Sequence, residues 1–190
     1  RVVLCISGVS GEGSKTFKSV DGVLYSKNGD TFYAYPNNKA GESYDILENT
    51  LTIKSYSFYG ANHLRFVTVP VSTTTIGSEP WTRCMKIERV DVKEGNLNYK
   101  SIDGVVYSTD GKTLIIYPPG KETSTFTINE NVETIGQYSF YGTTLLESVS
   151  IGKNVNSIIE NPWLYSYKLK SFNINEENTL FKVKNGVLFD

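Results

Sequence analysis

The chain is 190 residues long, with 19 basic and 20 acidic residues and a formal net charge of −1. This balance excludes a strongly basic surface for nucleic acid or an anionic membrane, and the sequence has no apolar run long enough to predict a spanning helix. Cys5 and Cys84 are the only cysteines, too few for a disulfide framework and without the spacing of a metal site.

Residues 1–16 form a short lead-in. RVVLCISG lacks the length and flanks of an intact signal peptide. The glycines of SGVSGEG are not followed by the Lys-Ser/Thr and helix of a phosphate-binding loop, so we interpret them as a flexible segment. Because the chain stops inside a repeat, we expect it to be part of a longer array.

A long repeat begins at Phe17 and returns at a fixed offset without a gap. FKSVDGVLYSKNGDTFYAYP, residues 17–36, returns as YKSIDGVVYSTDGKTLIIYP at 99–118, and a third copy begins at Phe181. The super-repeats therefore cover 17–98 and 99–180. Self-similarity of this length is typical of stacked repeat proteins, and we predict one β-rich solenoid over residues 1–190.

Each super-repeat opens with a predicted β-hairpin, at residues 22–35 and 104–117. The turns are assigned to Asn28-Gly29 and Asp110-Gly111, because these dipeptides supply the positive φ angles of a tight primed turn. Asp21, Asp103 and Asn185 each precede a glycine just before or within these copies. We interpret them as turn residues, since calcium binding would require more oxygen ligands than the motif offers.

Each 82-residue super-repeat also divides into one 36-residue module and two 23-residue modules. Their shared segment, seen as LRFVTV, IERVDV, LESVSI and LKSFNI, ends in the apolar–polar alternation of a half-buried strand. A turn and a compact return segment, 3₁₀ or a short helix, would complete each coil. We predict burial in successive strands of one sheet for these pairs: Tyr44/Ile46, Val67/Val69, Val90/Val92, Phe126/Ile128, Val149/Ile151 and Phe172/Ile174.

Small residues recur at one position of the coil: Ala61, Cys84, Thr143 and Ser166. We expect them to pack at a tight turn, where a short side chain can satisfy a backbone group. Cys84 is then a structural residue, because a nucleophile would require a base within reach and His63 is the only histidine. His63 itself is interpreted as a solvated loop residue.

Four tyrosines of the repeated YSFYG block allow two interpretations. Such side chains can stack on a sugar, but recurrence in every super-repeat favours packing between coils. The residues are Tyr56, Tyr59, Tyr138 and Tyr141.

These motifs resemble the BspA-like leucine-rich repeats. The resemblance runs from about residue 17 to the end and rests on the 23-residue period, the YSFYG block and the DGVLYS-NGDTFYAYP insert. Trp81 and Trp163 depart from it, since phenylalanine is usual there. The resemblance implies a leucine-rich-repeat solenoid of α/β type, a right-handed coil with a concave sheet. It also implies a surface or secreted setting in host-associated bacteria or parasitic protists, a role in adhesion or partner binding, and no catalytic residues.

Residues that alternate with the buried pairs form two outward columns on the predicted sheet. The first consists of Asp45, Thr68, Asp91, Thr127, Ser150 and Asn173, and the second of Ser43, Phe66, Arg89, Thr125, Ser148 and Ser171. An aromatic residue exposed on a sheet favours recognition, so Phe66 and Arg89 are the expected anchors. The alternatives are an ordinary solvated sheet face, or a cation–π contact of Arg89 over Phe66.

The sequence thus predicts a cell-surface or secreted binding or adhesion module with no enzyme activity, metal or cofactor. Its expected partner is a host or extracellular-matrix protein, or another cell-surface protein; no nucleic-acid binding and no membrane insertion are expected. Two alternatives stay open. A structural spacer within a larger surface protein would have a polar sheet face without a ligand, and a carbohydrate-binding module would expose several tyrosines in a groove.

Overall fold

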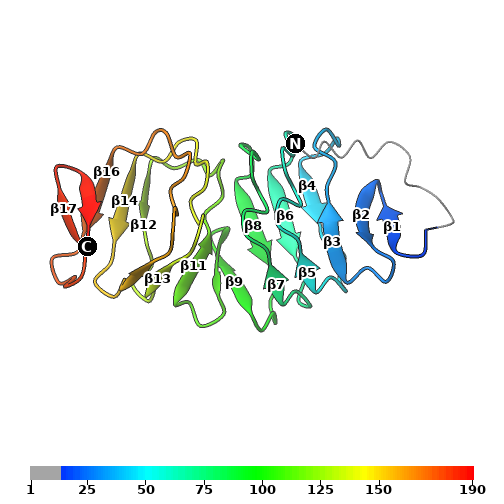
Figure 1. The fold of residues 1–190 in the computed structure, drawn as a ribbon, viewed down its shortest axis with the longest axis horizontal. Coiled ribbons are helices and arrows are strands. Elements are labelled where there is room, and N and C mark those ends of the chain that lie inside the picture. The colour runs from blue at the N-terminus through cyan, green and yellow to red at the C-terminus, as the bar shows by residue number, and fades with distance from the viewer. Residues whose placement is uncertain (1–13) are drawn as a thin grey trace.

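The computed structural model describes residues 14–190 as an elongated all-β solenoid (Figure 1). Short strands follow one another along the long axis, from blue β1 to red β17. No residue of this range lies in a helix, so the return segments consist of turns and two-residue strands in place of the expected 3₁₀ turn or helix. The lead-in up to residue 13, including Cys5 and the SGVSGEG glycines, lies outside the described residues.

Six strands carry the outward columns. Their spacing repeats the 23-residue and 36-residue modules of the sequence: β4 (Ser43–Asp45), β6 (Phe66–Val69), β8 (Arg89–Val92), β12 (Thr125–Thr127), β14 (Ser148–Ile151) and β16 (Ser171–Ile174). Every residue of the predicted inward pairs is buried or half-buried. The coil register predicted from the sequence is therefore confirmed within each super-repeat.

The prediction that these six strands share one sheet is wrong. They form two parallel three-stranded sheets, β4-β6-β8 and β12-β14-β16. The second insert separates them by occupying the free edge of β8. Val90 donates its backbone N–H to the Gly104 carbonyl at 3.0 Å, and Val92 donates to Ser101 Oγ at 2.9 Å.

The inserts are three-stranded meanders, one strand longer than the predicted hairpin. In each copy the last strand of the insert pairs in parallel with the two-residue strand of the next coil, which pairs in turn with that of the coil after it. This pairing gives two mixed five-stranded sheets. The first contains β1 (Phe17–Val20), β2 (Val23–Ser26), β3 (Thr31–Ala34), β5 (Thr52–Ile53) and β7 (Thr75–Ile76). The second contains β9 (Tyr99–Ile102), β10 (Val105–Ser108), β11 (Thr113–Ile116), β13 (Thr134–Ile135) and β15 (Ser157–Ile158). A third copy begins as the hairpin of β17 (Lys182–Lys184) and β18 (Val187–Phe189).

The primed turn lies at the other Asx-Gly pair of each insert. Asp21 and Gly22 both have positive φ, 49° and 80°, as the two-residue turn between β1 and β2 requires. The predicted pair behaves differently, because Gly29 has φ 87° while Asn28 is not left-handed. Gly29 is instead the last residue of an ordinary four-residue turn, in which its N–H donates to the Ser26 carbonyl at 2.9 Å. The hairpins themselves are confirmed, and the turn type is corrected.

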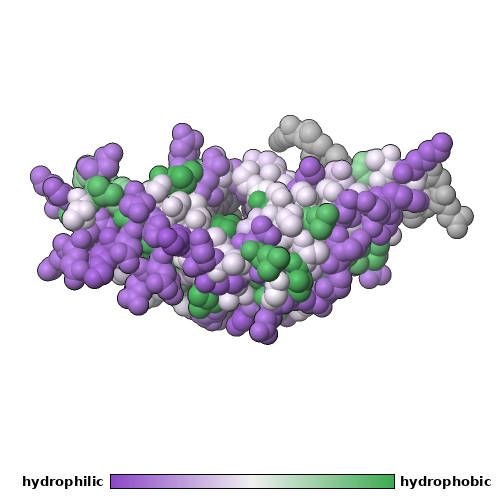
Figure 2. Space-filling model, turned by 90° about the horizontal axis from the view of Figure 1, so that it is seen from below, coloured by the Kyte–Doolittle hydropathy of each residue, from purple (hydrophilic) through white to green (hydrophobic). Residues whose placement is uncertain are grey.

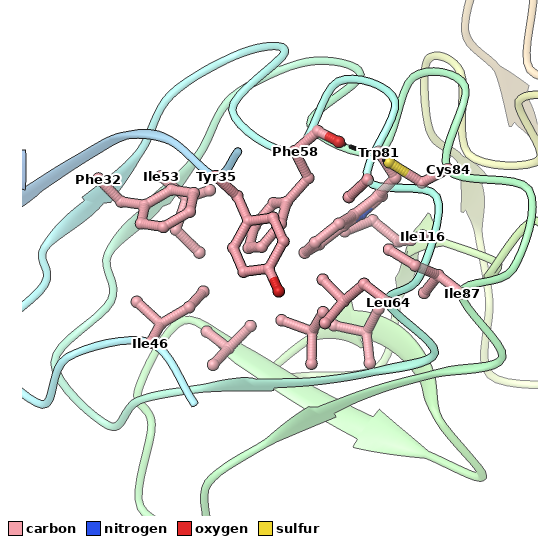
Figure 3. Close-up of a cluster of buried hydrophobic side chains, with 14 of the residues drawn as sticks. Phe32, Tyr35, Ile46, Ile53, Phe58, Leu64, Trp81, Cys84, Ile87 and Ile116 are labelled. Carbon is pink, nitrogen blue, oxygen red and sulfur yellow. Dashed lines mark hydrogen bonds between the residues drawn. The ribbon is translucent and has the colours of Figure 1, made fainter. Parts of the chain in front are cut away.

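Stacked aromatic rings fill the inside of each super-repeat. Phe58 lies between Phe32 and Trp81, with ring centroids 4.7 and 4.5 Å away (Figure 3). Phe140 lies likewise between Tyr117 and Trp163, at 5.1 and 5.9 Å. Each ring comes from a different coil, so burying the rings also fixes the alignment of successive coils.

The small residues beside these rings confirm the predicted burial, but only two of them satisfy a backbone group, and the buried Thr143 Oγ1 has no partner among the described residues. Ala61, Cys84, Thr143 and Ser166 are all buried. Cys84 donates its S–H to the Phe58 carbonyl at 2.7 Å (Figure 3), and Ser166 Oγ donates to the Phe140 carbonyl at the same distance. Equivalent backbone groups in the two super-repeats are thus satisfied by a thiol in one and a hydroxyl in the other.

Gly111 offers a test of the corrected turn. Its φ of 81° is unfavourable for a β-branched residue, so Gly111→Val is expected to lower the free energy of unfolding by about 1 kcal/mol or more. Gly152→Val is the matched control, because Gly152 is not left-handed and a Cβ there meets no atom closer than 3.9 Å. Urea unfolding would measure both, and equal losses would contradict a left-handed requirement at Gly111.

Candidate binding face of the repeat sheets

The outward columns exist as registered rows, each crossing the three strands of one sheet. Ser43, Phe66 and Arg89 are direct neighbours across β4, β6 and β8. In the other sheet the rows are Thr125, Ser148, Ser171 and Thr127, Ser150, Asn173. Neighbouring strands lie about 4.8 Å apart, so side chains of one row can contact a ligand together. Each predicted column is thus present, but it is divided at the second insert.

Phe66 is half-buried, less exposed than the sequence analysis expected. The guanidinium carbon of Arg65 lies 5.0 Å from the centroid of its ring, a cation–π contact. Arg89 bonds instead with the Asp91 carboxylate at 2.9 and 3.2 Å. The contact considered between Arg89 and Phe66 is therefore replaced by one from the preceding residue, and Arg89 is held by a carboxylate of its own strand.

A row of charges beside Phe66 was missed by the sequence analysis. Arg65 bonds with Glu88 through Nε at 2.7 Å and Nη2 at 2.8 Å, and its Nη1 bonds with Glu42 at 3.2 Å. These bonds raise the pKa of Arg65. The three residues follow the coil period, which would have revealed the row had charged positions been aligned as the apolar ones were.

The second sheet presents neutral hydroxyl and amide groups. Ser171 Oγ bonds with Ser148 Oγ at 3.2 Å, and Asn173 Nδ2 donates to the same oxygen at 3.0 Å. Its column residues are all uncharged, whereas the first sheet carries Asp45, Arg89 and Asp91. The two halves of the candidate face therefore differ in chemistry: the first offers an aromatic ring and charges, and the second offers mostly hydrogen-bonding groups.

Of the residues considered for catalysis, Cys84 is buried and His63 lies at the surface. Burial raises the pKa of the Cys84 thiol to about 12, which keeps it protonated. His63 is exposed, and its Nε2 lies 3.3 Å from Asn38 Oδ1. Residues 14–190 contain no group of three His, Cys, Asp or Glu side chains that could hold a metal ion. The same range holds no helix long and apolar enough to cross a membrane.

The four tyrosines divide into two kinds. Tyr138 and Tyr141 are half-buried and contact each other within one turn, with ring centroids 6.2 Å apart. The Tyr141 ring also lies 5.3 Å from that of Tyr165 in the next coil, as packing between coils predicts.

Tyr56 and Tyr59 are about half exposed, but both contact the next coil. The Tyr56 hydroxyl donates to Glu79 Oε1 at 3.4 Å, and the guanidinium carbon of Arg83 lies 5.7 Å from the centroid of the Tyr59 ring. Figure 2 shows a mostly hydrophilic surface on the side viewed from below, with small separate apolar areas and no continuous apolar patch.

A comparison with known protein families matches the repeated part of the sequence. A family model described as the BspA type leucine rich repeat region matches residues 31–116 and 119–186 in six copies. No curated protein matches the sequence significantly.

Three solved structures share the fold. A leucine-rich repeat protein from Eubacterium ventriosum matches 70% of this chain with a TM-score of 0.59 and 24% identity, over 42% of its own length. The pneumococcal vaccine antigen PcpA matches 72% with a TM-score of 0.57 and 21% identity, over 40% of its length. A leucine rich cell surface protein from Faecalibacterium prausnitzii matches 67% with a TM-score of 0.59 and 24% identity, over 34% of its length. The matched part of this chain thus covers 34–42% of the length of these proteins.

The turn residue Asp103 provides a pH-dependent test. Lys121 donates to its carboxylate at 2.8 Å, and this bond lowers the pKa of Asp103 below the usual 3.8. The ionised carboxylate favours the folded state, so its contribution is complete above the ordinary carboxyl pKa and is lost as pH falls through the lowered folded-state pKa. Because Asp103 is 74% exposed, Asp103→Asn is expected to cost no more than about 1 kcal/mol at neutral pH.

Urea unfolding of the unchanged protein and of Asp103→Asn would measure this cost in the free energy of unfolding, at neutral pH and at a pH below the lowered carboxyl pKa. Glu94→Gln is the control, because the exposed Glu94 forms none of the ion pairs found in residues 14–190. A penalty for Asp103→Asn that is the same at both pH values would contradict a role for the charge.

Proposed function

The chain belongs to the BspA-type leucine-rich-repeat family, and from that premise we propose that it is a non-catalytic binding or adhesion module of the cell surface or a secreted protein. Its partner in this proposal is a host or extracellular-matrix protein, or another cell-surface protein. The surface setting is supported by the description of the Faecalibacterium prausnitzii relative as a cell surface protein. The partner would contact the outward rows of the repeat sheets.

One observation carries the choice of site. Phe66 presents a half-buried ring in the middle of the first sheet, on β6, with the Arg65 guanidinium 5.0 Å from its centroid and Arg89 as its neighbour on β8. A partly exposed aromatic ring beside arginines is the kind of group that dominates binding energy at protein interfaces, while surrounding polar residues mainly exclude water. The first sheet therefore holds the proposed anchor.

The neutral second sheet supports a peripheral role. Its Ser148, Ser171 and Asn173 side chains already bond with one another, so a partner gains little by competing for them. Under this proposal these residues, with Thr127 and Ser150, adjust the fit of a partner whose main contacts lie on β6 and β8.

The test is binding of the chain to a panel of purified extracellular-matrix proteins. For any panel member that binds, Phe66→Ala and Arg89→Ala are each expected to raise the dissociation constant about thirtyfold, the equivalent of about 2 kcal/mol. The matched controls lie away from these rows: Tyr33→Ala removes a partly exposed ring from β3, and Lys54→Ala removes an exposed charge from the return segment. Melting temperatures would show that each variant is folded.

Equal affinities of the Phe66 and Arg89 variants and the two controls would remove the sheet face from consideration. If the chain binds no member of the panel and no other surface protein, that result would favour the structural spacer over the adhesion module.

A further inference from the structure

The regular stacking of coils is interrupted once in residues 14–190, between the two super-repeats. The ring stack that includes Phe58 ends at Trp81, and a new stack begins at Tyr117. No aromatic contact joins Trp81 to Tyr117 within the described range. We call this interruption, between residues 76–82 and 115–119, the seam. Without it, one continuous row of rings would pass through the molecule.

The backbone ladder between turns stops at the same place. Phe58 and Gly60 donate to the Pro80 and Thr82 carbonyls of the next coil, both at 2.9 Å. Phe140 and Gly142 make the equivalent bonds to the following coil. Among the described residues, no backbone hydrogen bond joins turn 80–83 to residues 117–119. The two coils are joined instead further along the turn, where Gly120 donates its N–H to the Ile87 carbonyl at 2.7 Å.

A pocket of about 230 Å³ occupies the seam. Residues 76–82 of the first super-repeat form one wall, and residues 115–119 and 136–141 of the second form the other. Its lining includes Trp81 and Ile116, which lie together at the edge of the first core cluster (Figure 3). The lining shares no residue with the outward rows of β4, β6 and β8, so this site is separate from the sheet face.

Two buried polar groups of the lining have no partner. The Trp81 indole N–H belongs to a side chain that is 5% exposed, and Ser139 Oγ to one that is 1% exposed. The equivalent Trp163 and Ser57 are also unpartnered, so the repeat itself creates these groups. Each of these atoms has less than 1 Å² of accessible surface, so they lie behind the wall of the pocket, and a ligand in the pocket would contact other atoms of Trp81 and Ser139.

The rest of the lining defines the chemistry of that ligand. Tyr138 and Tyr141 add aromatic faces, and Gln137 and Glu79 add an exposed amide and a carboxylate. Burial and the nearby Glu79 raise the pKa of Tyr141 to about 12, so its hydroxyl stays a donor. The lining has an acid and no Lys, Arg or His, which disfavours an anion. Its volume is below the usual range of drug-sized sites and suits one small ring.

A row of tyrosines leads away from the pocket. The Tyr141 ring lies 5.3 Å from that of Tyr165, which lies 5.9 Å from that of Tyr167. Tyr165 is 48% exposed and Tyr167 is 85% exposed. Such rings offer apolar faces to the later units of an oligomeric ligand whose first unit occupies the pocket.

We propose that the seam between the super-repeats binds one neutral pyranose unit of a glycan, with the tyrosine row contacting the units that follow. The exposed amide of Gln137 bonds with a sugar hydroxyl, and the aromatic rings of Tyr138 and Tyr141 contact the C–H face of the sugar. The site binds a ligand of a different class, on a different surface, from the protein partner proposed above.

The two tryptophans allow a direct test by NMR. In ¹⁵N-labelled protein each indole gives one N–H signal, and Trp163→Phe assigns the Trp81 signal by elimination. The probes are the methyl pyranosides of glucose, galactose, mannose and N-acetylglucosamine, with the methyl glycoside of N-acetylneuraminic acid as the anionic control. At least one neutral probe is expected to shift the Trp81 signal with saturation and to leave the Trp163 signal in place, and the anionic probe is expected to shift neither.

Gln137→Ala tests the assigned contact. Gln137 is exposed and bonds with no described residue, so its loss should leave the fold intact and weaken binding of the neutral probe about tenfold. Glu160→Ala is the matched control, because Glu160 holds the same position one coil later, outside the pocket. An unchanged affinity for Gln137→Ala, or no shift with any neutral probe, would overturn the proposal. A shift of the Trp81 signal with N-acetyltyrosinamide alone would overturn it in favour of an aromatic side chain of a protein.

Discussion

The structure depends on the stacking of each coil on the next. A single coil is too thin to enclose its own apolar side chains, so it buries them only against neighbouring coils. Phe58 shows the requirement clearly: its ring is fully buried because Phe32 and Trp81 cover its two faces. The short Cys84 side chain allows the next coil to approach closely and satisfies the Phe58 carbonyl. The ring, the small residue and the hydrogen-bonded carbonyl together set the spacing of the solenoid.

The 36-residue insert module modifies this stacking and creates both candidate sites. By occupying the edge of β8 it ends the first sheet, so Phe66 and Arg89 belong to a short charged face separated from the neutral one. On the other side of the coil it interrupts the ring stack between Trp81 and Tyr117 and leaves the lined pocket there. A regular array without the insert would have continuous ladders at both places. The insert is therefore the element that gives this repeat protein distinct surfaces.

Sequence periodicity predicted the coils well because burial repeats with the period of the coil. The inward pairs, the small residues at the Cys84 position and the hairpins could all be predicted in this way. The division of the sheet could not, since it depends on where the backbone of Gly104 lies relative to Val90. The Asp21-Gly22 turn had a clear signal, but the Asn28-Gly29 pair competed with it as the stronger hairpin motif. The seam pocket involves contacts between modules of different length, which a comparison of equivalent positions does not reveal.

The central claim is that aromatic stacking couples coils within a super-repeat and stops at the seam. A double-mutant cycle on the free energy of unfolding tests it with Phe58→Leu, Trp81→Leu and Phe140→Leu. Phe58 and Trp81, 4.5 Å apart, are expected to show a coupling energy of about 0.5–1.5 kcal/mol, whereas Phe58 and Phe140, in separate stacks, should be additive to within about 0.5 kcal/mol. Equal coupling in the two pairs would contradict the account.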